Sequence, residues 1–348
     1  MTLLLAGDIG GTKTLLSLVR CTGSTLEPVA QERFLSAEWQ ELGAMLRRFL
    51  ADQLPAGATP PAAACLAVAG PVRAGRAQLT NLSWHLEEGE LAAASGIPRL
   101  ELVNDFAVLI DGLPHLQPEQ QTLLRAGEAD PTAPVLVVGA GTGLGVALGV
   151  PVAGGLQPLA SEAAHAEFAP RTEAEWQLKQ WLRQDLQLER VSIERVVSGT
   201  GLGQVFRWLL NQAPAEGRAD ENHRLTGLAE RWAGAEEASD RGDLPAAVAV
   251  AAQQGDPLAR EALTLWLEAY GSACGDLALA CLPGGGIWLA GGTAGKLVQE
   301  LGSTRFLKPL LAKGRLGAAL QPIPVRAITD PAIGSYSAAC RARRLLAV

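Results

Sequence analysis

Short apolar runs alternate along the chain with longer stretches that carry most of the charged residues. Apolar runs of four to eight residues that are bounded by turn-forming residues are typical of buried strands. The runs predict strands at residues 3–8, 14–19, 62–69, 100–103, 134–138, 146–148 and 287–290. The intervening stretches at 38–52, 212–257 and 335–346 predict helices. Alternating strands and helices favour an α/β architecture.

One pattern occurs twice: a strand, a turn of glycine and threonine, and a second strand. Residues 3–8 lead into Gly10-Gly11-Thr12, and residues 134–138 lead into Gly141-Thr142-Gly143. The two units start about 130 residues apart, which predicts an internal structural duplication. A prior of about 150 residues per domain likewise gives two domains. We therefore expect two similar halves.

Two common nucleotide-binding motifs fit these turns poorly. A GxGxxG pattern does not match residues 139–146, and a GxxxxGK[ST] pattern from Gly7 has Thr12 where the second glycine belongs. Residues 14–19 are typical of a strand, whereas a helix follows a P-loop. A P-loop protein stays an alternative, which a helix beginning at Lys13 would support. The simplest alternative is that the turns are unrelated to one another.

Composition and charge narrow the function classes. The 348 residues include 29 Lys and Arg against 36 Asp and Glu, a formal charge of −7, and no basic cluster is visible. This balance argues against nucleic acid or an anionic membrane as the main partner. Residues 131–161 and 277–295 are uncharged, but the glycines and prolines of the first stretch favour strands over a membrane helix.

The expected location is the cytoplasm. The five cysteines are scattered and form no CxxC motif, so we expect reduced and mostly buried thiols. No signal-peptide pattern is visible before Asp8.

The glycine turns resemble the motifs of the sugar-kinase, Hsp70 and actin superfamily. Residues 7–14 are similar to its first phosphate motif, Gly141-Thr142-Gly143 to its second, and Ala290-Gly291-Gly292 to its adenosine motif. More narrowly, the sequence resembles bacterial glucokinases of the non-ROK type. Supporting matches lie at residues 80–84, 103–106, 161–165, 193–199 and 312–315. The Cys-rich zinc motif of the ROK sister family is absent from the sequence.

The resemblance implies an α/β, two-domain actin-like ATPase (ribonuclease H-like) fold with a cleft between the domains. Residues 1–115 would form a small α/β domain completed by a C-terminal helix at 331–348, and residues 116–330 a large α/β domain. The implied activity transfers the γ-phosphate of ATP to the 6-hydroxyl of glucose. Two alternatives stay open: another hexose kinase of the same fold, and an actin- or Hsp70-like ATPase without sugar chemistry.

The resemblance also implies the nucleotide site, with ATP and Mg²⁺ as cofactors. Backbone N–H groups of glycine turns can approach phosphates closely because no Cβ is in the way. A carboxylate near phosphates needs a cation between them, so Asp8 is expected to orient a water molecule on Mg²⁺. The expected nucleotide-binding residues are Gly7, Asp8, Ile9, Gly10, Gly11, Thr12, Gly141, Thr142, Gly143, Gly291 and Gly292.

A sugar kinase needs polar side chains for the hydroxyl groups and a carboxylate that accepts a proton. By resemblance, Asp105 is the general base toward the 6-hydroxyl and also binds the substrate. The other expected substrate-binding residues are Asn81, Asn104, Glu162, His165 and Glu194. One helical turn would place Glu162 and His165 on the same face. A zinc site at this pair would lack a third ligand.

Simpler structural interpretations of these residues stay open. Asn104 and Asp105 could form a turn that only caps the next helix. Glu194 could form a surface ion pair with Arg195, and Asn81 could be an ordinary loop amide. The expected partners are glucose and ATP, without nucleic acid or membrane, and a homodimer is one of the states that the resemblance allows.

Overall fold

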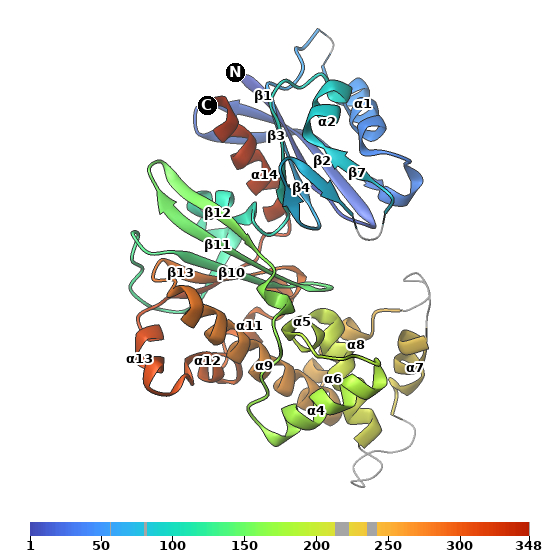
Figure 1. Cartoon of the computed structure of the whole chain (residues 1–348), viewed down its shortest axis with the longest axis vertical. Coiled ribbons are helices and arrows are strands. Elements are labelled where there is room, and N and C mark those ends of the chain that lie inside the picture. The colour runs from blue at the N-terminus through green and yellow to red at the C-terminus, as the bar shows by residue number, and fades with distance from the viewer. Residues whose placement is uncertain (56, 80–81, 213–222, 235–241, 348) are drawn as a thin grey trace. The chain divides into compact units, whose positions relative to one another are not determined.

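The computed structural model describes residues 1–55, 57–79, 82–212, 223–234 and 242–347 (Figure 1). The contacts divide the chain into two compact units. Unit 1 comprises Met1–Gln121, Ala147–Ala160 and Asp330–Val348, and unit 2 comprises Thr122–Val146 and Ser161–Thr329. The boundaries drawn from the sequence at 115 and 330 stay a prediction; the contacts also group residues 147–160 with unit 1.

The elements of the fold have the following bounds. The strands are β1 (Thr2–Ile9), β2 (Lys13–Thr22), β3 (Thr25–Leu35), β4 (Ala63–Val68), β5 (Val72–Arg73), β6 (Arg76–Gln78), β7 (His85–Glu87), β8 (Leu100–Asn104), β9 (Gln121–Arg125), β10 (Val135–Ala140), β11 (Leu144–Val152), β12 (Gly155–Ser161), β13 (Gly286–Ala290) and β14 (Val325–Ile328). The α-helices are α1 (Leu42–Gln53), α2 (Glu88–Ser95), α3 (Leu109–Gly112), α4 (Glu173–Asp185), α5 (Ile193–Val196), α6 (Gly199–Gln212), α7 (Thr226–Gly234), α8 (Leu244–Gln253), α9 (Pro257–Cys281), α10 (Gly292–Lys296), α11 (Val298–Leu301), α12 (Thr304–Leu311), α13 (Gly317–Leu320) and α14 (Ile333–Arg344).

The two larger sheets share one strand order, as the repeated sequence pattern predicts. Their orders are β3-β2-β1-β4-β8 and β12-β11-β10-β13-β14-β9. In both, three consecutive strands lie side by side, and the next two strands of the sheet follow on the other side of the first. β1 pairs with β4 in parallel, and β10 pairs with β13 in parallel. The second sheet differs by one further strand, β9, beside β14.

The structure decides the question of the P-loop. Lys13 begins strand β2, which pairs with β1 in an antiparallel hairpin. Because a P-loop requires a helix at this position, that alternative is wrong. The first helix is shorter than predicted: it begins at Leu42, and a single 3₁₀ turn (Ser36–Glu38) lies before it.

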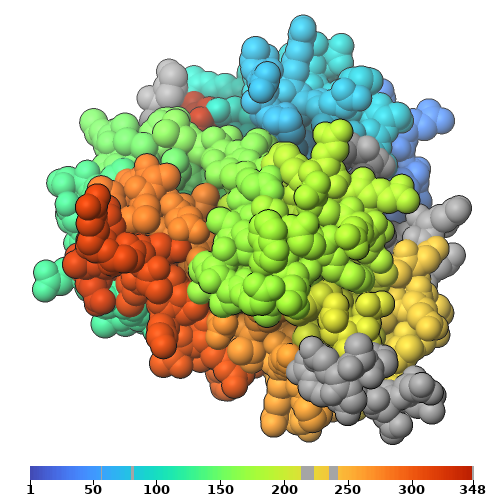
Figure 2. Space-filling view, turned by 60° about the horizontal axis from the view of Figure 1, so that its bottom comes forward, coloured from blue at the N-terminus to red at the C-terminus, as the bar shows by residue number. Residues whose placement is uncertain are grey.

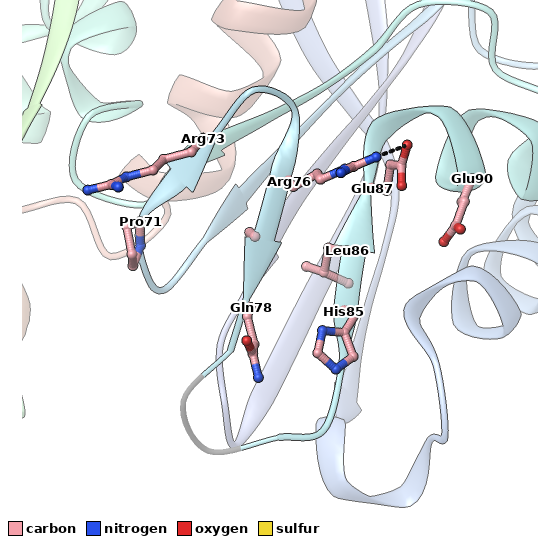
Figure 3. Close-up of a pocket in the computed structure, with 9 residues that line it drawn as sticks. Pro71, Arg73, Arg76, Gln78, His85, Leu86, Glu87 and Glu90 are labelled. Atoms are coloured by element: carbon pink, nitrogen blue, oxygen red, sulfur yellow. Dashed lines mark hydrogen bonds and ion pairs between the residues drawn. The ribbon is translucent and has the colours of Figure 1, made fainter.

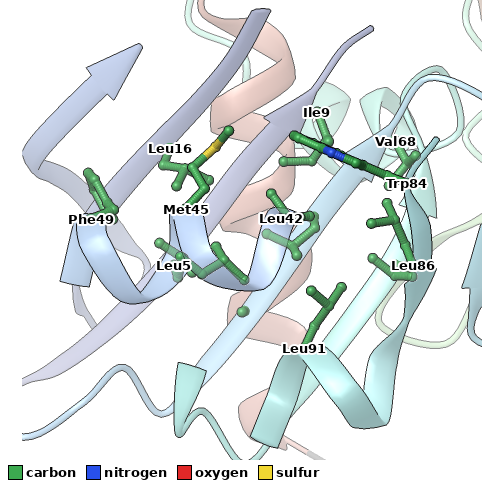
Figure 4. Close-up of a cluster of buried hydrophobic side chains, with 14 of the residues drawn as sticks. Leu5, Ile9, Leu16, Leu42, Met45, Phe49, Val68, Trp84, Leu86 and Leu91 are labelled. Atoms are coloured by element: carbon green, nitrogen blue, oxygen red, sulfur yellow. The ribbon is translucent and has the colours of Figure 1, made fainter. Parts of the chain in front are cut away.

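A buried apolar cluster holds the sheet of unit 1 against α1 and α2 (Figure 4). Leu42, Met45 and Phe49 of α1 project onto the sheet, where Leu5 and Leu16 face them; all five are almost completely buried. Their i, i+3 and i+4 spacing is that of one apolar helix face. The inner residues of β1 and all of β4 are buried, as expected for strands covered on both faces.

Helix α14 covers the other face of this sheet (Figure 1). Arg341 donates two hydrogen bonds to the Glu101 carboxylate, at 2.8 and 2.6 Å, and Arg344 binds the buried carboxylate of Asp111. Burial raises the pKa of Asp111, against the opposing effect of the Arg341 and Arg344 charges. The C-terminal segment is therefore an integral part of unit 1.

In unit 2, α9 and α12 approach each other closely. A Cβ atom at Gly271 would lie 2.1 Å from the Phe306 carbonyl oxygen, and one at Gly275 would lie 2.2 Å from that of Leu310. The side chain of Lys313 passes beside Gly275, where its Nζ donates to Ser272 O and to Asp276 Oδ1, at 2.8 and 2.6 Å. Residues 312–315 thus fasten the end of α12 to α9.

The uncharged stretches do not form membrane spans. Residues 131–161 form β10, β11 and β12 with their turns, as their glycine and proline content predicts. Within the described ranges, no helix combines the length and the apolar character needed to cross a bilayer. All five cysteines are free, and four of them are buried, which confirms the expected buried thiols.

Replacing Lys313 with methionine is expected to lower the free energy of unfolding by about 1–3 kcal/mol, because buried acceptors lose their donor. Urea unfolding of the variant measures the change. Lys308→Met is the matched control, because Lys308 is an exposed residue of α12. Equal stability of the two variants would contradict the role assigned to Lys313.

Candidate functional site

The first glycine turn closes the β1–β2 hairpin. Gly10 N–H donates to the Lys13 carbonyl at 3.0 Å. A Cβ atom at Gly10 would lie 2.8 Å from that carbonyl oxygen, so the turn requires glycine there. Gly10 and Gly11 are half-buried and Thr12 is exposed, so the turn can be reached from solvent.

Asp8 lies near the end of β1, with its carboxylate close to the first turn of α14. A Cβ atom at Gly334 would lie 3.3 Å from Asp8 Oδ2. Burial raises the pKa of Asp8. The neighbouring Gly7 and Ile9 belong to the core: Gly7 packs against Leu66, and the Ile9 side chain lies in the cluster of Figure 4. Their predicted contact with a nucleotide would have to use the backbone.

The second glycine turn lies between β10 and β11. Gly141 N–H donates to Gly143 O at 2.8 Å, and the Gly141 carbonyl accepts from Gly199 N–H at 2.7 Å. A Cβ atom at Gly143 would lie 2.5 Å from Glu194 Oε2. That same oxygen accepts a hydrogen bond from Leu144 N–H at 2.9 Å. Glu194, predicted to bind a sugar hydroxyl, therefore supports this turn with one of its two oxygens.

The third glycine turn connects β13 to α10. Gly291 has a φ of +82°, and a Cβ atom there would lie 2.8 Å from the Ala140 carbonyl oxygen. Thr293 Oγ1 donates to the same carbonyl at 2.8 Å. The end of β10 and the start of α10 are thereby held together, which only glycine at 291 permits.

A cavity of about 450 Å³ in unit 2 joins the second and third turns. Its lining includes Gly141 and Thr142 from the second turn and Gly292 and Thr293 from the third. The remaining lining residues are Gly199, Thr200, Leu202, Trp232, Gly242, Asp243, Pro245, Ala246, Ala249, Lys296 and Leu297. The lining combines the backbone of glycine turns, apolar side chains and a few polar side chains, a composition typical of small-molecule sites.

Sequence reasoning missed most of this lining. Gly199-Thr200-Gly201 repeats the composition of Gly141-Thr142-Gly143, and this repetition is the signal that could have revealed it. Trp232 is almost fully buried and packs against Gly203 of α6. Lys296 is exposed at the end of α10. No sequence motif marks either residue.

Asp105 follows directly on β8, where its N–H donates to the Val68 carbonyl of the neighbouring strand at 3.0 Å. Its Oδ1 accepts hydrogen bonds from Phe106 N–H and Asn104 Nδ2, at 3.0 and 3.1 Å. The residue is half-buried, so its carboxylate is fixed in direction yet reachable. Such a fixed carboxylate is suited to accept a proton from a bound alcohol.

Asn104 caps the turn that follows β8. Its Oδ1 accepts from Phe106 N–H and Ala107 N–H, each at 3.0 Å, and its Nδ2 donates to Gly70 O and Asp105 Oδ1, each at 3.1 Å. These bonds close the turn at residues 104–107; they do not cap the next helix, α3, whose N-cap is Val108 without a side-chain bond. Its contact with a sugar stays a prediction and would require one of these bonds to be exchanged.

Glu162 and His165 share one face of a 3₁₀ turn, as their spacing predicts. Glu162 precedes the turn (Ala163–His165), and Glu162 Oε2 lies 3.7 Å from His165 Nε2. Both side chains are more than half exposed, at 63% for Glu162 and 54% for His165. Figure 2 shows that residues from about 160 to 200, green to yellow-green, cover a broad part of the surface.

Backbone pairing brings Glu194 close in the fold to this turn. Ile193 N–H donates to Ala166 O at 2.9 Å, and Phe168 N–H donates to Val191 O at 2.8 Å. Glu194 therefore follows a segment paired with the residues just after His165. Among the described residues Glu194 forms no ion pair with Arg195; its Oε2 accepts from Leu144 N–H instead, so the surface-pair interpretation is wrong.

The predicted residues are distributed over both units. Asp8, Asn104 and Asp105 belong to unit 1, and Glu162, His165 and Glu194 belong to unit 2. Asn81 lies outside the described residues. Across the described ranges, no group of three or more His, Cys, Asp or Glu residues could hold a metal ion.

A larger, open pocket of about 590 Å³ lies on the small sheet β5-β6-β7 (Figure 3). None of the predicted site residues lines it. Its two arginines are balanced by two glutamates, and Arg76 pairs with Glu87 at 3.2 Å. This pocket therefore lacks the charge that would select an ionic ligand.

Comparison with known proteins identifies relatives along the whole chain. A family model described as Glucokinase matches residues 5–345. A glucokinase of Nostoc punctiforme is 40% identical over 350 residues, which cover 99% of this chain and all of that protein. A glucokinase of Synechocystis sp. is 39% identical and covers 96% of each chain.

The fold has a solved counterpart as well. The crystal structure of a glucokinase from an Antarctic psychrotroph matches with a TM-score of 0.79 and 29% identity, over 99% of both chains. This likeness confirms the expected two-domain α/β fold of the actin-like ATPase type. On the full-length family match and the 40% identity to curated relatives, the chain belongs to the glucokinase family.

Proposed function

We propose that this protein transfers the γ-phosphate of ATP to the 6-hydroxyl of glucose, with Asp105 as the general base. The observation that carries the proposal is the Asp105 carboxylate itself, which is held at Oδ1 by two donors at the end of β8 and stays reachable from solvent. Membership of the glucokinase family supplies the substrate class.

The sugar would be bound through its hydroxyl groups by Asn81, Asn104, Asp105, Glu162, His165 and Glu194. Glu162 and His165 offer an acceptor and a donor 3.7 Å apart on an exposed turn. Glu194 has one oxygen engaged with Leu144 N–H and a second that can accept from a hydroxyl. An acceptor that is covered by the bound sugar without a matching hydroxyl would cost about 1–3 kcal/mol, which would favour one hexose over its isomers.

The nucleotide would be bound by the glycine turns. The 450 Å³ cavity supports this assignment, because it joins Gly141 and Thr142 to Gly292 and Thr293 in one concave surface. Gly10, Gly11 and Thr12 would supply further backbone donors, and Gly7, Ile9, Gly143 and Gly291 would shape the turns. Fixed N–H groups stabilise phosphoryl transfer mainly by positioning and by electrostatic attraction.

The Asp8 carboxylate suits Mg²⁺ that is bound mainly by water and phosphate, rather than a metal ion whose ligands all come from the protein. Asp8 is a single half-buried carboxylate beside the first glycine turn. Mg²⁺ typically retains water and is bound by one or two carboxylates together with substrate phosphates. Asp8 would hold the ion through water, and the ion would neutralise charge on the phosphates.

The acidic balance of the chain supports small molecules, rather than nucleic acid or an anionic membrane, as partners. Action in the cytoplasm, within glycolysis, belongs to the same proposal and rests on the family resemblance. A homodimer is part of the same proposal and rests on the family resemblance alone.

The proposed function predicts glucose-dependent release of ADP from ATP. A coupled assay over glucose, mannose, fructose and glucosamine, with ATP and polyphosphate as donors, measures it. We expect the highest kcat/KM with glucose and ATP. ATP hydrolysis that is independent of every hexose would instead indicate an ATPase without sugar chemistry.

Asp105→Asn is expected to lower kcat by about 10²–10⁴-fold, because the amide cannot accept the proton but can still accept the bonds at Oδ1. Glucose binding, measured by calorimetry, should persist. Asp52→Asn is the control, because Asp52 is an exposed residue of α1 whose carboxylate pairs with Arg48 of the same helix. Full turnover by Asp105→Asn would exclude this residue as the base.

Glu162→Gln is expected to weaken glucose binding by about 10-fold, since a charged acceptor is lost. The KM for ATP should change little. Glu173→Gln serves as the control, because Glu173 is an exposed residue at the start of α4. A change confined to the KM for ATP would contradict the assignment of Glu162 to the sugar.

A further inference from the structure

The first and second glycine turns share a feature beyond their glycines: a hydroxyl side chain from another element binds the outward carbonyl groups of each turn. At the first turn this residue is Ser36, the first residue of the 3₁₀ turn after β3. At the second it is Thr200, in the first turn of α6. Both donate to carbonyl oxygens of the glycine turns, and neither is among the nucleotide-binding residues expected from the sequence, although Thr200 also lines the cavity of unit 2.

Ser36 is completely buried and makes three hydrogen bonds through its Oγ and N–H groups. Its Oγ donates to Gly10 O at 2.8 Å, and its N–H donates to Thr12 O at 3.0 Å. Since its only hydroxyl hydrogen is used on Gly10, the hydroxyl of buried Thr14 must donate in the 3.1 Å bond between the two side chains. Two of the three carbonyls of the turn are therefore fixed by one residue.

Thr200 acts in the same way on the second turn. Its Oγ1 donates to Thr142 O at 2.8 Å, while Gly199 N–H donates to Gly141 O at 2.7 Å. The next amide, Gly201 N–H, is satisfied by Ser198 Oγ at 2.9 Å. The N–H groups of Gly199 and Gly201, at the start of α6, thus donate to protein acceptors. This end of the helix therefore binds the second glycine turn and not a ligand.

These bonds determine where the N–H groups of the turns point. In a trans peptide the C=O and N–H bonds are antiparallel, and the described residues contain no cis peptide. Fixing Gly10 O therefore turns Gly11 N–H to the opposite side, and fixing Gly141 O and Thr142 O does the same for the N–H groups of Thr142 and Gly143. In the described part of the chain, these three N–H groups donate to no protein acceptor.

We propose that Ser36 and Thr200 are positioning residues for ATP, which hold the carbonyl groups of the two glycine turns so that the opposite N–H groups are oriented toward the phosphates. This inference rests on the proposed function, since it assigns the turns to the nucleotide. Its specific claim is that the two hydroxyls act on the phosphate groups only and have no effect on the nucleoside.

Calorimetric titration of Ser36→Ala and Thr200→Val with ATP and with adenosine tests the claim. Each variant is expected to bind ATP about 2- to 10-fold more weakly, the usual effect of one lost hydrogen bond, with adenosine affinity unchanged. Thr200→Ser keeps the hydroxyl and should restore ATP affinity. The KM for ATP should rise in parallel, and the KM for glucose should not.

Matched controls exist in each unit. Ser95 Oγ donates to Leu91 O in α2 at 2.7 Å, and Thr264 Oγ1 donates to Arg260 O in α9 at 2.7 Å. Ser95→Ala and Thr264→Val remove the same kind of bond far along the chain from the turns and should leave ATP affinity unchanged. Thr200 is half-exposed, so its variants keep the test decisive even where Ser36→Ala fails to fold.

Two results would overturn the inference: ATP affinity equal to that of the wild type in Thr200→Val, or equal losses for ATP and adenosine. Failure of the wild-type protein to bind ATP at all would overturn the proposed function and the inference together. Weak ATP binding with normal adenosine binding in the Thr200 variant alone would still support the claim for the second turn.

Discussion

Both larger sheets depend on the hydrogen bonding of their first strand. β1 lies between antiparallel β2 and parallel β4, and β10 lies between β11 and parallel β13. Because only three residues separate β1 from its neighbour β2, and β10 from its neighbour β11, the chain must reverse at each strand end in a tight turn. Glycine meets this requirement because a side chain at Gly10 would collide with the Lys13 carbonyl. Each turn leaves backbone carbonyl groups without a partner in the sheet, and donors from other elements, such as Ser36 and Thr200, bind them.

Much of the architecture could be predicted from the sequence, because the signals are local. Each predicted apolar run lies in a strand (β1, β2, β4, β8, β10, β11 and β13), whereas β3, β9, β12 and β14 were not predicted. The repetition of a strand, a Gly/Thr turn and a strand matched the shared strand order of the two sheets. The spacing of Glu162 and His165 placed them on one turn, although that turn is 3₁₀ rather than α-helical. The first helix began later than predicted because Ser36 is used in a separate turn.

The hydrogen-bond partners of the site residues and the lining of the cavity were harder to predict, because they depend on contacts between segments that lie far apart in the sequence. The side chain of Asn104 suits both a sugar hydroxyl and a helix cap, so residue type alone left both open. Its four hydrogen bonds instead close the turn after β8, and α3 is capped at Val108 without a side-chain bond. Trp232 and Lys296 line the cavity of unit 2 from two different helices. No periodicity in the sequence brings those helices together.

The covering of the unit 1 sheet by α14 has a consequence for how the protein is made. Unit 1 takes its residues from three stretches of the chain, and α14 comes after all of unit 2 in the order of synthesis. Domains that emerge early normally fold first. Here the face of β1 and β4 that α14 covers waits, apolar and unprotected, until the ribosome has produced residues 333–344. A first unit made of one continuous segment would not leave such a face uncovered while the second unit is being synthesised.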